Sequence, residues 1–403
     1  MRILAELERA HEVRLEVVAF PDALHGGRRA AQVLGEREEC ITAQLLTLKR
    51  NLGKPVAVVR DMSDGIEAAV RRVFPGTYAI TCHYHFLRAV GTKLFEPLYQ
   101  WLRNKVDRRG VKKRLRSMHQ SLKQGRRQDG ETSLALELIE YIMAYKKEAG
   151  GLPYPFSLPA VPFYRRCDEV GVRVRRAILA NARENRSSPV LSRLEDTLRL
   201  LKPPPAVLGR LHSDFLALEE RWRWFERVRR CLRYRHGPVP LSTSVKLSER
   251  ELEMGRRKID WLLNKIDELE RRAVNGHHAR ELRKSLRKVA RLIREPQEEL
   301  FAPNVSVRVK GRTVVRKLPR TNSPVEVDFR KVRRHSRRIR GNSDVEQQVR
   351  REGAGMLVAM NLTNREYVRV VYGSIDRIGE SFSKVSSEAM TLAKSLMTHP
   401  GRL

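Results

Sequence analysis

The feature that most constrains the fold of this 403-residue chain is a hydrophobic pattern that changes twice. Residues 1–86 mix short strand-like runs with helical periodicity, and strand signals return at 301–345. Between them, residues 87–300 repeat apolar side chains at helical spacing, and a further helical segment covers 346–403. We therefore expect an α+β fold in which two α/β segments, the first with a mixed sheet, flank roughly two hundred helical residues.

The first segment is expected to contain a strand hairpin followed by a parallel crossover. A β-branched run ending at Asp61 is typical of a strand buried on both faces. Ser63 or Asp64 can cap the helix that follows, and Pro75-Gly76 closes it. The expected elements are strands at 15–20 and 29–34, a helix at 38–52, a strand at 55–61, a helix at 65–74 and a strand at 78–82.

Two hairpins are expected later in the chain. Apolar side chains at helical spacing mark helices over 259–269 and 282–293, and Asn275-Gly276 breaks the pattern between them, which predicts an αα-hairpin. At 305–309 and 313–318 apolar and polar residues alternate around a turn signal, which predicts a β-hairpin.

The charge of the chain points to a polyanionic partner. Lys and Arg outnumber Asp and Glu by 81 to 47, a net charge of +34. Residues 1–86 hold 12 basic and 11 acidic residues, so nearly all of the surplus lies in 87–403. It is dense at 103–127, with 11 basic residues and Asp107 alone, and at 305–340, with 13 basic residues and two acids. Scattered surface charge without a polyanionic partner is the alternative.

Composition excludes several other classes. Hydrophobic residues make up 41% of the chain, which is enough to bury a core. The sequence contains no run of about 18 apolar residues and no apolar stretch typical of a secretory signal, so we expect no membrane partner. The cysteines are Cys40, Cys82, Cys167 and Cys231. Because they form no CxxC pair, they argue against a disulfide scaffold or zinc ribbon and favour the cytoplasm.

Two acidic residues are candidates for catalysis. Asp61 ends a predicted strand, where a carboxylate can project into a cleft; alternatively, it caps the next helix. Glu326 begins a predicted helix, and basic residues follow it on one face: Arg330, Arg333, Arg334 and Arg337. The alternative for Glu326 is pairing with Arg330 and a favourable interaction with the helix dipole.

A carboxylate among arginines suggests cleavage of nucleic acid. Phosphodiester cleavage commonly uses two hard cations about 4 Å apart, held by carboxylates. The hypothesis is that Asp61 and Glu326 bind Mg²⁺ or Mn²⁺ while the arginines hold phosphates. The two acids are 265 residues apart (326 minus 61), so the fold must bring them together.

The run Cys82-His83-Tyr84-His85 lies where a predicted strand runs into a helix. Its three potential ligands raise the possibility of a zinc site, but no second ligand cluster with matching spacing follows. The alternative is a buried cysteine and a hydrogen-bonded histidine that pack against the sheet.

Three motifs, taken in order, resemble the core of DDE transposases of the bacterial insertion-sequence and Mutator-like superfamily. They are Val58-Val59-Arg60-Asp61-Met-Ser-Asp-Gly-Ile with Val73-Phe74-Pro75-Gly76, then Cys82-His83-Tyr84-His85-Phe86-Leu87-Arg88, then Thr321-Asn322-x-x-x-Glu326 with Phe329 and arginines up to Gly341. Cys82 and His85 match the family's Cys-x-x-His pair. The motifs span residues 15–341, and their joint order is more specific than any one of them.

The resemblance implies a ribonuclease H-like core in two parts, 1–86 and 301–345, interrupted by a helical insertion at 87–300 and followed by a helical segment at 346–403. It also implies Mg²⁺- or Mn²⁺-dependent cleavage and transfer of DNA strands. The implied partners are transposon ends, target DNA and further copies of the chain, in a bacterial cytoplasm at the nucleoid.

On this resemblance Asp61 and Glu326 are the metal ligands and catalytic residues. The expected DNA-binding residues are Arg330, Arg333, Arg334, Arg337, Arg338, Arg340, Lys112, Lys113 and Arg114. Cys82, His85 and Asn322 match family motifs without an assigned chemical step.

One departure bears on activity. The family's first catalytic Asp precedes the predicted hairpin, but residues 1–14 contain no Asp, and Asp22 comes one strand too late. We therefore expect a chain that starts late and has lost this acid, which would leave it slow or inactive. A non-catalytic nucleic-acid-binding protein derived from a transposase is the main alternative. A nuclease relative acting on RNA or branched DNA is a third.

Overall fold

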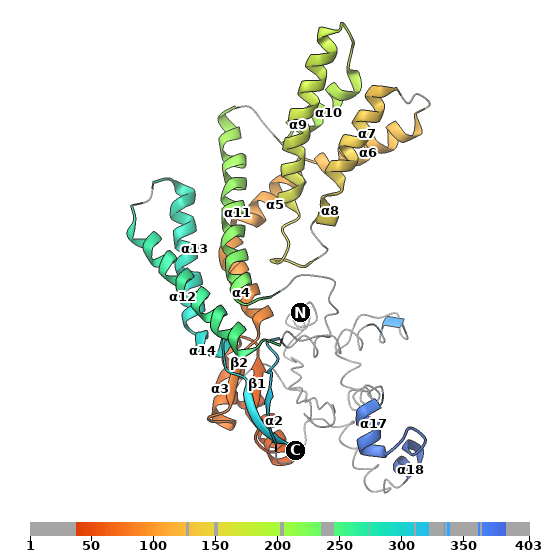
Figure 1. The fold of residues 1–403 in the computed structure, drawn as a ribbon. Coiled ribbons are helices and arrows are strands. Elements are labelled where there is room, and N and C mark those ends of the chain that lie inside the picture. Colours follow the sequence, from red (N-terminus) through yellow and green to blue (C-terminus); the bar gives the residue numbers. More distant parts are fainter. Residues whose placement is uncertain are drawn as a thin grey trace. The chain divides into compact units, whose positions relative to one another are not determined.

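The computed structural model describes residues 38–125, 129–148, 152–201, 205–234, 246–273, 275–309, 312–321, 334, 337–338, 362 and 365–383. The predicted strands at 15–20 and 29–34, with Asp22, lie outside these residues. The chain divides into two compact units (Figure 1). Unit 1 comprises Met1–Tyr84, His236–Leu252 and Glu298–Leu403, and unit 2 comprises His85–Arg235 and Glu253–Gln297.

Over the described residues the fold is α+β, as expected: it is mostly helical, with two small sheets of two strands each. Both sheets lie in unit 1. None of the helices in this part of the chain combines the length and the hydrophobicity that crossing a bilayer requires.

A parallel crossover forms the centre of unit 1. Strand β1 (Ala57–Arg60) pairs in parallel with β2 (Tyr78–Thr81), and α3 (Asp64–Val73) connects them, which confirms the predicted crossover. Burial alternates along β1, with Val58 and Arg60 buried and the residues between them half-buried. The β-branched composition predicted a strand buried on both faces. In the structure only one face is fully buried, and the other is half-buried.

Helix α2 (Glu38–Leu52) covers the fully buried face of β1. Its Ile41 and Leu45 share an apolar cluster with Val58 of β1 and with Val70 and Val73 of α3. Gly53 ends the helix at a φ of 78°, a conformation that other residues rarely adopt.

A β-hairpin packs against the other face of β1. Strands β3 (Val305–Val309) and β4 (Arg312–Arg316) pair antiparallel, as predicted. Val305 shares an apolar cluster with Ile80 of β2, and Val59 of β1 packs against that cluster. The hairpin and the parallel pair are separate sheets among the described residues, so a single mixed sheet stays a prediction.

Helices make up unit 2. They are α4 (His83–Phe95), α5 (Leu98–Arg108), α6 (Val111–Gln124), α7 (Gly130–Met143), α8 (Tyr145–Glu148), α9 (Ala160–Arg183), α10 (Pro189–Arg199), α11 (Pro205–Cys231), α12 (Glu249–Arg271) and α13 (His277–Arg294) (Figure 1). The first residues of α4 and α12 belong to unit 1. Unit 1 also contains most of α14 (Gln297–Leu300), and α17 (Arg365–Tyr372) and α18 (Ile378–Ser383).

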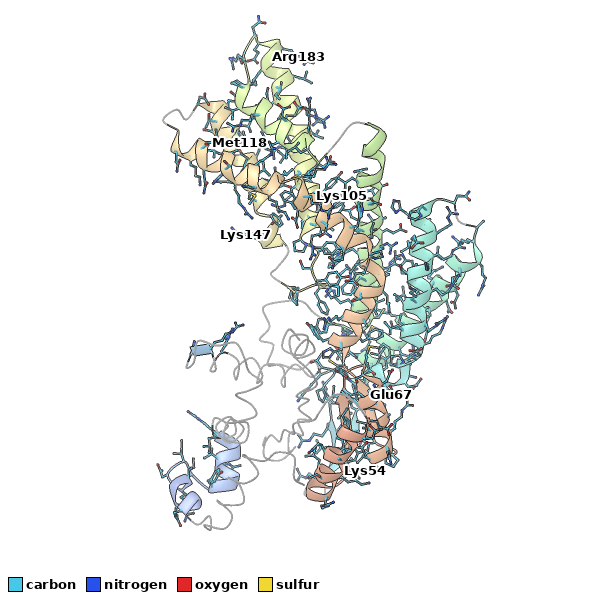
Figure 2. All side chains as sticks on the ribbon, turned by 180° about the vertical axis from the view of Figure 1, so that it is seen from behind. Lys54, Glu67, Lys105, Met118, Lys147 and Arg183 are labelled. Atoms are coloured by element: carbon cyan, nitrogen blue, oxygen red, sulfur yellow. The ribbon has the colours of Figure 1, made fainter. Side chains whose placement is uncertain are left out.

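The basic segment 103–127 is divided between two helices. Gly110, with a φ of 66°, separates α5 from α6. The cations of the basic segment therefore belong to two different helices. Figure 2 shows Lys105 on α5 and Met118 on α6. Leu115 and Met118 of α6 are buried.

Close packing fixes the C-terminal half of α4 within unit 2. Gly91 lies where an added Cβ would be 2.4 Å from Cγ of Pro155 and 3.2 Å from the ring of Phe225. Buried Arg221 of α11 donates to the carbonyl of Leu94 at 2.7 Å and to the hydroxyl of Ser285 at 3.0 Å. Helices α4, α11 and α13 are therefore linked by both apolar and polar contacts.

Helices α12 and α13 form the predicted αα-hairpin. Gly276 precedes α13 with a φ of 93°, which explains why the helical pattern breaks there. Arg294 contacts Asp267 and Arg287 contacts Glu270, so the two helices run antiparallel. Leu282, Leu286, Val289 and Ile293 form the buried face of α13.

Candidate active site at the end of β1

Asp61 lies at the carboxyl end of β1, where the chain turns into α3. Its Oδ1 accepts a hydrogen bond from the backbone N–H of Ser63 at 3.0 Å, and the side chain is half-buried. Ser63 is the N-cap of α3 and makes no capping bond with its own side chain. The capping alternative is therefore partly right: Asp61 stabilises the turn before α3, and Ser63 occupies the cap position.

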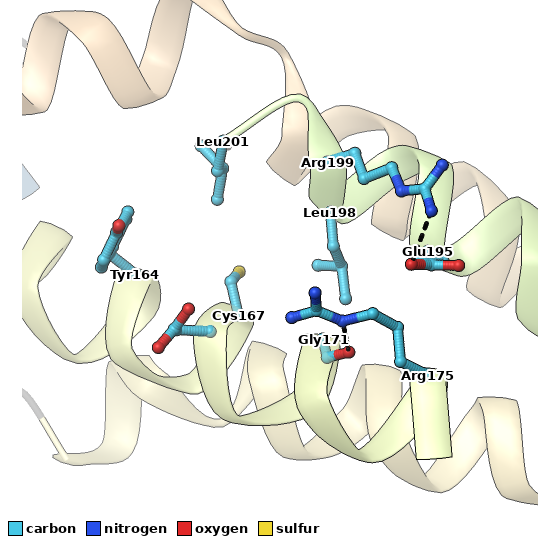
Figure 3. A pocket seen from close by; sticks show the side chains of 9 residues that line it. Tyr164, Cys167, Gly171, Arg175, Glu195, Leu198, Arg199 and Leu201 are labelled. Atoms are coloured by element: carbon cyan, nitrogen blue, oxygen red, sulfur yellow. Dashed lines mark hydrogen bonds and ion pairs between the residues drawn. The ribbon is translucent and has the colours of Figure 1, made fainter. Parts of the chain in front are cut away.

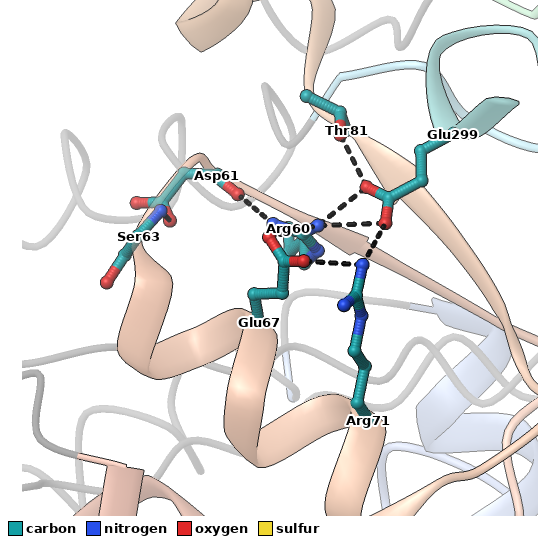
Figure 4. Close-up of polar contacts among 7 residues, drawn as sticks. All are labelled: Arg60, Asp61, Ser63, Glu67, Arg71, Thr81 and Glu299. Carbon is teal, nitrogen blue, oxygen red and sulfur yellow. Dashed lines mark hydrogen bonds and ion pairs between the residues drawn. The ribbon is translucent and has the colours of Figure 1, made fainter. Parts of the chain in front are cut away.

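Arg60 holds the backbone that carries Asp61. Its guanidinium is buried, and Nη2 donates to both carboxylate oxygens of Glu299, at 2.9 and 2.7 Å (Figure 4). The same nitrogen lies 2.8 Å from a carboxylate oxygen of Glu67. Nη1 donates to the carbonyl oxygen of Asp61 at 3.2 Å. The side chain that precedes Asp61 thus fixes the peptide group that follows it.

Glu299 joins the ends of both parallel strands. It lies in α14 and accepts a hydrogen bond from the hydroxyl of Thr81 at 2.6 Å. Thr81 is the last residue of β2 and stands opposite Arg60 in the strand register. One carboxylate therefore contacts the final residue of each strand, and the contact spans 239 residues of sequence.

This cluster balances its own charge. Glu67 pairs with Arg71 at 2.6 Å as well as with Arg60, so two carboxylates face two guanidinium groups (Figure 4). Breaking a largely buried pair of this kind typically costs about 3–5 kcal/mol, because one charge is left uncompensated. The cluster (Arg60, Glu67, Arg71, Thr81 and Glu299, hereafter the strand-end cluster) is therefore a structural support beside Asp61.

The fit of a divalent metal depends on how many hard oxygen ligands are present. Asp61 is a suitable ligand for Mg²⁺ or Mn²⁺, whereas Glu67 and Glu299 are bound by guanidinium groups. Over the described residues no three His, Cys, Asp or Glu side chains gather as a metal site would require. Glu326 lies outside these residues, so the expected pairing of Asp61 with Glu326 stays a prediction.

His83 begins α4 in a fully buried position. Its Nε2 lies 2.9 Å from the carbonyl oxygen of Leu300, and because a carbonyl only accepts, Nε2 carries the proton. Among the described residues Nδ1 has no hydrogen-bond partner. Burial lowers the pKa of His83 to about 4, and the nearby charge of Arg320 acts in the same direction. His83 is therefore neutral near pH 7 and has a packing role.

Arg320 is the largest fully buried side chain in the described part of the chain. Its backbone carbonyl accepts from the N–H of His83 at 2.9 Å, and Nη2 lies 3.4 Å from Oδ1 of Asn304. Nε and Nη1 find no hydrogen-bond partner in the part of the chain that the structure describes. Burial lowers the pKa of Arg320 to about 10, so the side chain stays charged at neutral pH.

In the motif from Cys82 to His85, Cys82 and His83 stabilise the fold. Cys82 is fully buried, and its N–H extends the β1–β2 ladder by donating to the carbonyl of Arg60 at 2.8 Å. The alternative of a packed cysteine and a hydrogen-bonded histidine is confirmed for Cys82 and His83. His85 lies half-buried in the first turn of α4.

The expected phosphate-binding residues differ in their exposure and in whether the protein already pairs their charge. Lys112 pairs with Asp107 at 2.8 Å and lies over the rings of Phe163 and Tyr145, so unit 2 itself uses its charge. Lys113 and Arg114 are exposed. In the third segment Arg334, Arg337 and Arg338 are exposed, whereas Asn322, Glu326, Arg330, Arg333 and Arg340 lie outside the described residues.

Unit 2 contains a cavity of about 220 Å³ between α9 and α10 (Figure 3). Its charged groups are engaged: Arg199 pairs with Glu195 at 3.0 Å, and Arg175 donates to the carbonyl of Gly171. Burial raises the pKa of the Cys167 thiol, which therefore stays protonated and is a poor nucleophile. The thiol is therefore not a reactive group of this cavity, whose lining also includes Tyr164 and Asp168.

Sequence reasoning missed Arg60, Glu299 and Arg320 as supports of the site. A signal existed for Arg60, because a charged residue at the inward position of a buried strand needs a buried partner. No protein-family model matches the chain, and searches of curated proteins and of solved structures found no match either. The assignment of function therefore rests on the motifs and on the geometry around Asp61.

Proposed function

We propose that the chain is a DDE-type DNA transposase with a ribonuclease H-like core, which cleaves and transfers the strands of a mobile element. The observation that carries the proposal is the parallel β1–α3–β2 unit with Asp61 directly after β1. In open sheets with parallel strands, ligands bind beyond the carboxyl ends of the strands. Asp61 occupies that end within a series of motifs whose order resembles this family.

In this proposal Asp61 and Glu326 hold Mg²⁺ or Mn²⁺. The metal, when bound, polarises the scissile phosphate and activates the attacking oxygen. Water attacks the scissile phosphorus and the bond to O3′ breaks, which leaves a 3′-hydroxyl and a 5′-phosphate. The 3′-hydroxyl then attacks a phosphate of the target DNA and displaces the 3′-oxygen of the target strand, so one phosphodiester bond forms as another breaks. The strand-end cluster keeps Asp61 in place during both steps. Lys113, Arg114 and the arginines after Glu326 hold the DNA backbone.

The partners follow from the same chemistry. Transfer of an element joins two DNA ends to one target, so the active form is an oligomer of this chain on DNA. The site of action is the bacterial nucleoid. The proposed partners are therefore transposon ends, target DNA and further copies of the chain.

A non-catalytic nucleic-acid-binding protein is the second candidate. The observation that favours it is that exposed cations, among them Lys113, Arg114 and Arg337, need no catalytic centre in order to hold phosphates. This function would keep the fold and the basic surface without cleavage.

Nicking of supercoiled plasmid by the purified chain separates the two functions. We expect slow nicking with Mg²⁺ or Mn²⁺, because the family's first catalytic Asp has no identified counterpart, and none with a chelator. Asp61→Asn should reduce the nicking rate at least about 100-fold, because loss of a metal ligand removes several kcal/mol of transition-state stabilisation. Asp64→Asn is the matched control, since Asp64 lies exposed in the first turn of α3.

DNA binding, measured in parallel, makes each outcome decisive. Glu326→Ala should lose nicking and keep binding, and loss of binding in this variant would count against its catalytic role. If the unmodified chain binds DNA but does not nick it with either metal, the binding function is favoured. If Asp61→Asn and Asp64→Asn nick equally well, Asp61 is not a metal ligand.

A further inference from the structure

The cations of α13 are sorted into two rows. Arg283, Arg287 and Arg294 lie toward α12 and are satisfied there. Arg287 contacts Glu270 at 3.1 Å, and Arg294 makes two contacts with Asp267, at 2.7 and 2.8 Å. Arg283 donates to the carbonyl of Arg272. This first row therefore serves to hold the two helices together.

The second row lies on a different side of the helix. Its members, hereafter the α13 stripe, are Arg280, Lys284, Lys288 and Arg291. Spacings of four, four and three residues place them within roughly 80° of one another around an α-helix. All four are exposed, and none makes an ion pair within the part of the chain that the structure describes.

Packing fixes the direction of this stripe. The opposite side of α13 is buried through Leu282, Leu286, Val289 and Ile293, and Ser285 contacts Arg221. The helix therefore cannot rotate to cover the stripe. Over its eleven-residue span the stripe is about 16 Å long, with cations roughly 6 Å apart along the axis.

The dimensions suit one strand of a DNA backbone. A DNA strand carries one phosphate per roughly 3.4 Å of helix axis, so a row of about 16 Å faces four or five phosphates. An anionic membrane suits the surface poorly, because an interfacial helix needs an exposed apolar face and that of α13 is buried in the unit.

We propose that the α13 stripe is a phosphate-contact surface for double-stranded DNA. The choice of DNA among polyanions rests on the proposed function, whereas the stripe follows from the contacts of α13 alone. Point charges without a base-reading side chain contact the backbone whatever its sequence. The stripe thus supplies affinity and position rather than sequence recognition.

Two variants with equal loss of charge test the proposal in the full chain. Lys284→Gln with Lys288→Gln removes two charges from the stripe, and Arg287→Gln with Arg294→Gln removes two from the row that faces α12. Binding to a 30-base-pair duplex is measured by fluorescence anisotropy between 50 and 200 mM salt. The stripe variant should reduce the slope of log affinity against log salt by about 1.8, since each phosphate contact contributes about 0.9.

The unmodified chain should therefore lose roughly tenfold more affinity over this salt range than the stripe variant. The variant with Arg287→Gln and Arg294→Gln should leave the salt-dependence slope unchanged and should lower the midpoint of thermal unfolding instead. Equal slopes in the two variants would overturn the proposal, because net charge alone would then explain binding. Tighter, stripe-dependent binding to duplex RNA would overturn the choice of DNA.

Failure of this inference is distinguishable from failure of the proposed function. A chain that binds DNA through the stripe but never nicks plasmid keeps the inference and loses the transposase. A chain that nicks plasmid while both variants bind alike keeps the transposase and loses the stripe.

Discussion

Arg60 and Glu299 are the pair on which the geometry near Asp61 most depends. Arg60 contacts Glu299 through both carboxylate oxygens and also contacts the carbonyl of Asp61. The β-branched run predicted that Asp61 follows a strand, because local sequence determines such a boundary. Glu299 could not be predicted as its support, because the two residues of the pair are 239 positions apart and nothing local specifies which acid arrives.

Removing Glu299 should destabilise the chain through Arg60. We expect Glu299→Ala to lower the free energy of unfolding by about 3 kcal/mol, because Arg60 loses its bidentate partner in a buried position. Glu295→Ala is the control, since Glu295 is exposed and should change stability by less than about 0.5 kcal/mol. Urea unfolding followed by circular dichroism measures both. Equal midpoints for the two variants would contradict the role of Glu299.

His83 gives unit 1 a dependence on pH. Its pKa is about 4 in the folded chain, against the ordinary histidine pKa of 6.5, so between these values the unfolded chain binds a proton that the folded chain does not. Stability is therefore fully present above pH 6.5 and falls as the pH falls toward 4. Between pH 7 and pH 5 this group alone should remove about 2 kcal/mol.

His83→Gln tests this, because glutamine can donate to the carbonyl of Leu300 and does not titrate. The loss of stability between pH 7 and pH 5, measured by urea unfolding, should be smaller in the variant by about 2 kcal/mol. His277→Gln is the control, since His277 is exposed. A pH dependence that is the same in His83→Gln and in the unmodified chain would contradict the buried, neutral state of His83.

At the scale of elements, periodicity predicted well where burial follows local spacing. The β1–α3–β2 crossover, the β3–β4 hairpin and the α12–α13 hairpin all appear where they were expected, although α12 and α13 extend beyond the ranges that their apolar spacing marked. The strand ending at Asp61 is shorter than predicted, and its two faces are unequally buried. A β-branched run is compatible with a strand buried on both faces and with one fully buried on a single face, because the degree of burial depends on which distant elements pack on each face.

Two glycines inside helices should respond in opposite directions to substitution. Gly91→Ala in α4 places a Cβ 2.4 Å from Pro155 and should destabilise the chain by about 1–3 kcal/mol. Gly171→Ala in α9 meets no atom within 4 Å and should stabilise it by about 0.5–1 kcal/mol. Thermal unfolding of the two variants measures both effects. A stabilising Gly91→Ala would contradict the close packing of α4 on the residues around Pro155.

At the scale of the whole molecule, the surplus of 34 positive charges separates into groups with different roles. Arg60 and Arg71 in unit 1 balance acids beside Asp61, and Lys112 in unit 2 pairs with Asp107. The α13 stripe has no such partner in the described chain. Composition predicted a polyanionic partner but could not separate these groups, because pairing depends on which helices meet.

The same division separates binding from chemistry. The α13 stripe lies in unit 2, whereas Asp61 and the strand-end cluster lie in unit 1. Variants in the stripe should change DNA affinity and its salt dependence without changing the metal requirement of cleavage. Variants at Asp61 should change the metal requirement of cleavage without changing DNA affinity or its salt dependence.

In the proposed transposase Asp61 holds the metal that cleaves DNA, so a substitution at Asp61 should change the metal preference of cleavage. The measurement is plasmid nicking by Asp61→Cys in Mg²⁺ and in Mn²⁺. A thiolate is a softer ligand than a carboxylate, and Mn²⁺ accepts it more readily than Mg²⁺ does. If Asp61 holds the metal, Asp61→Cys loses nicking in Mg²⁺ and regains part of it in Mn²⁺, while the unmodified chain uses both metals. Unchanged nicking in Mg²⁺, or an equal loss in both metals, would contradict this role of Asp61.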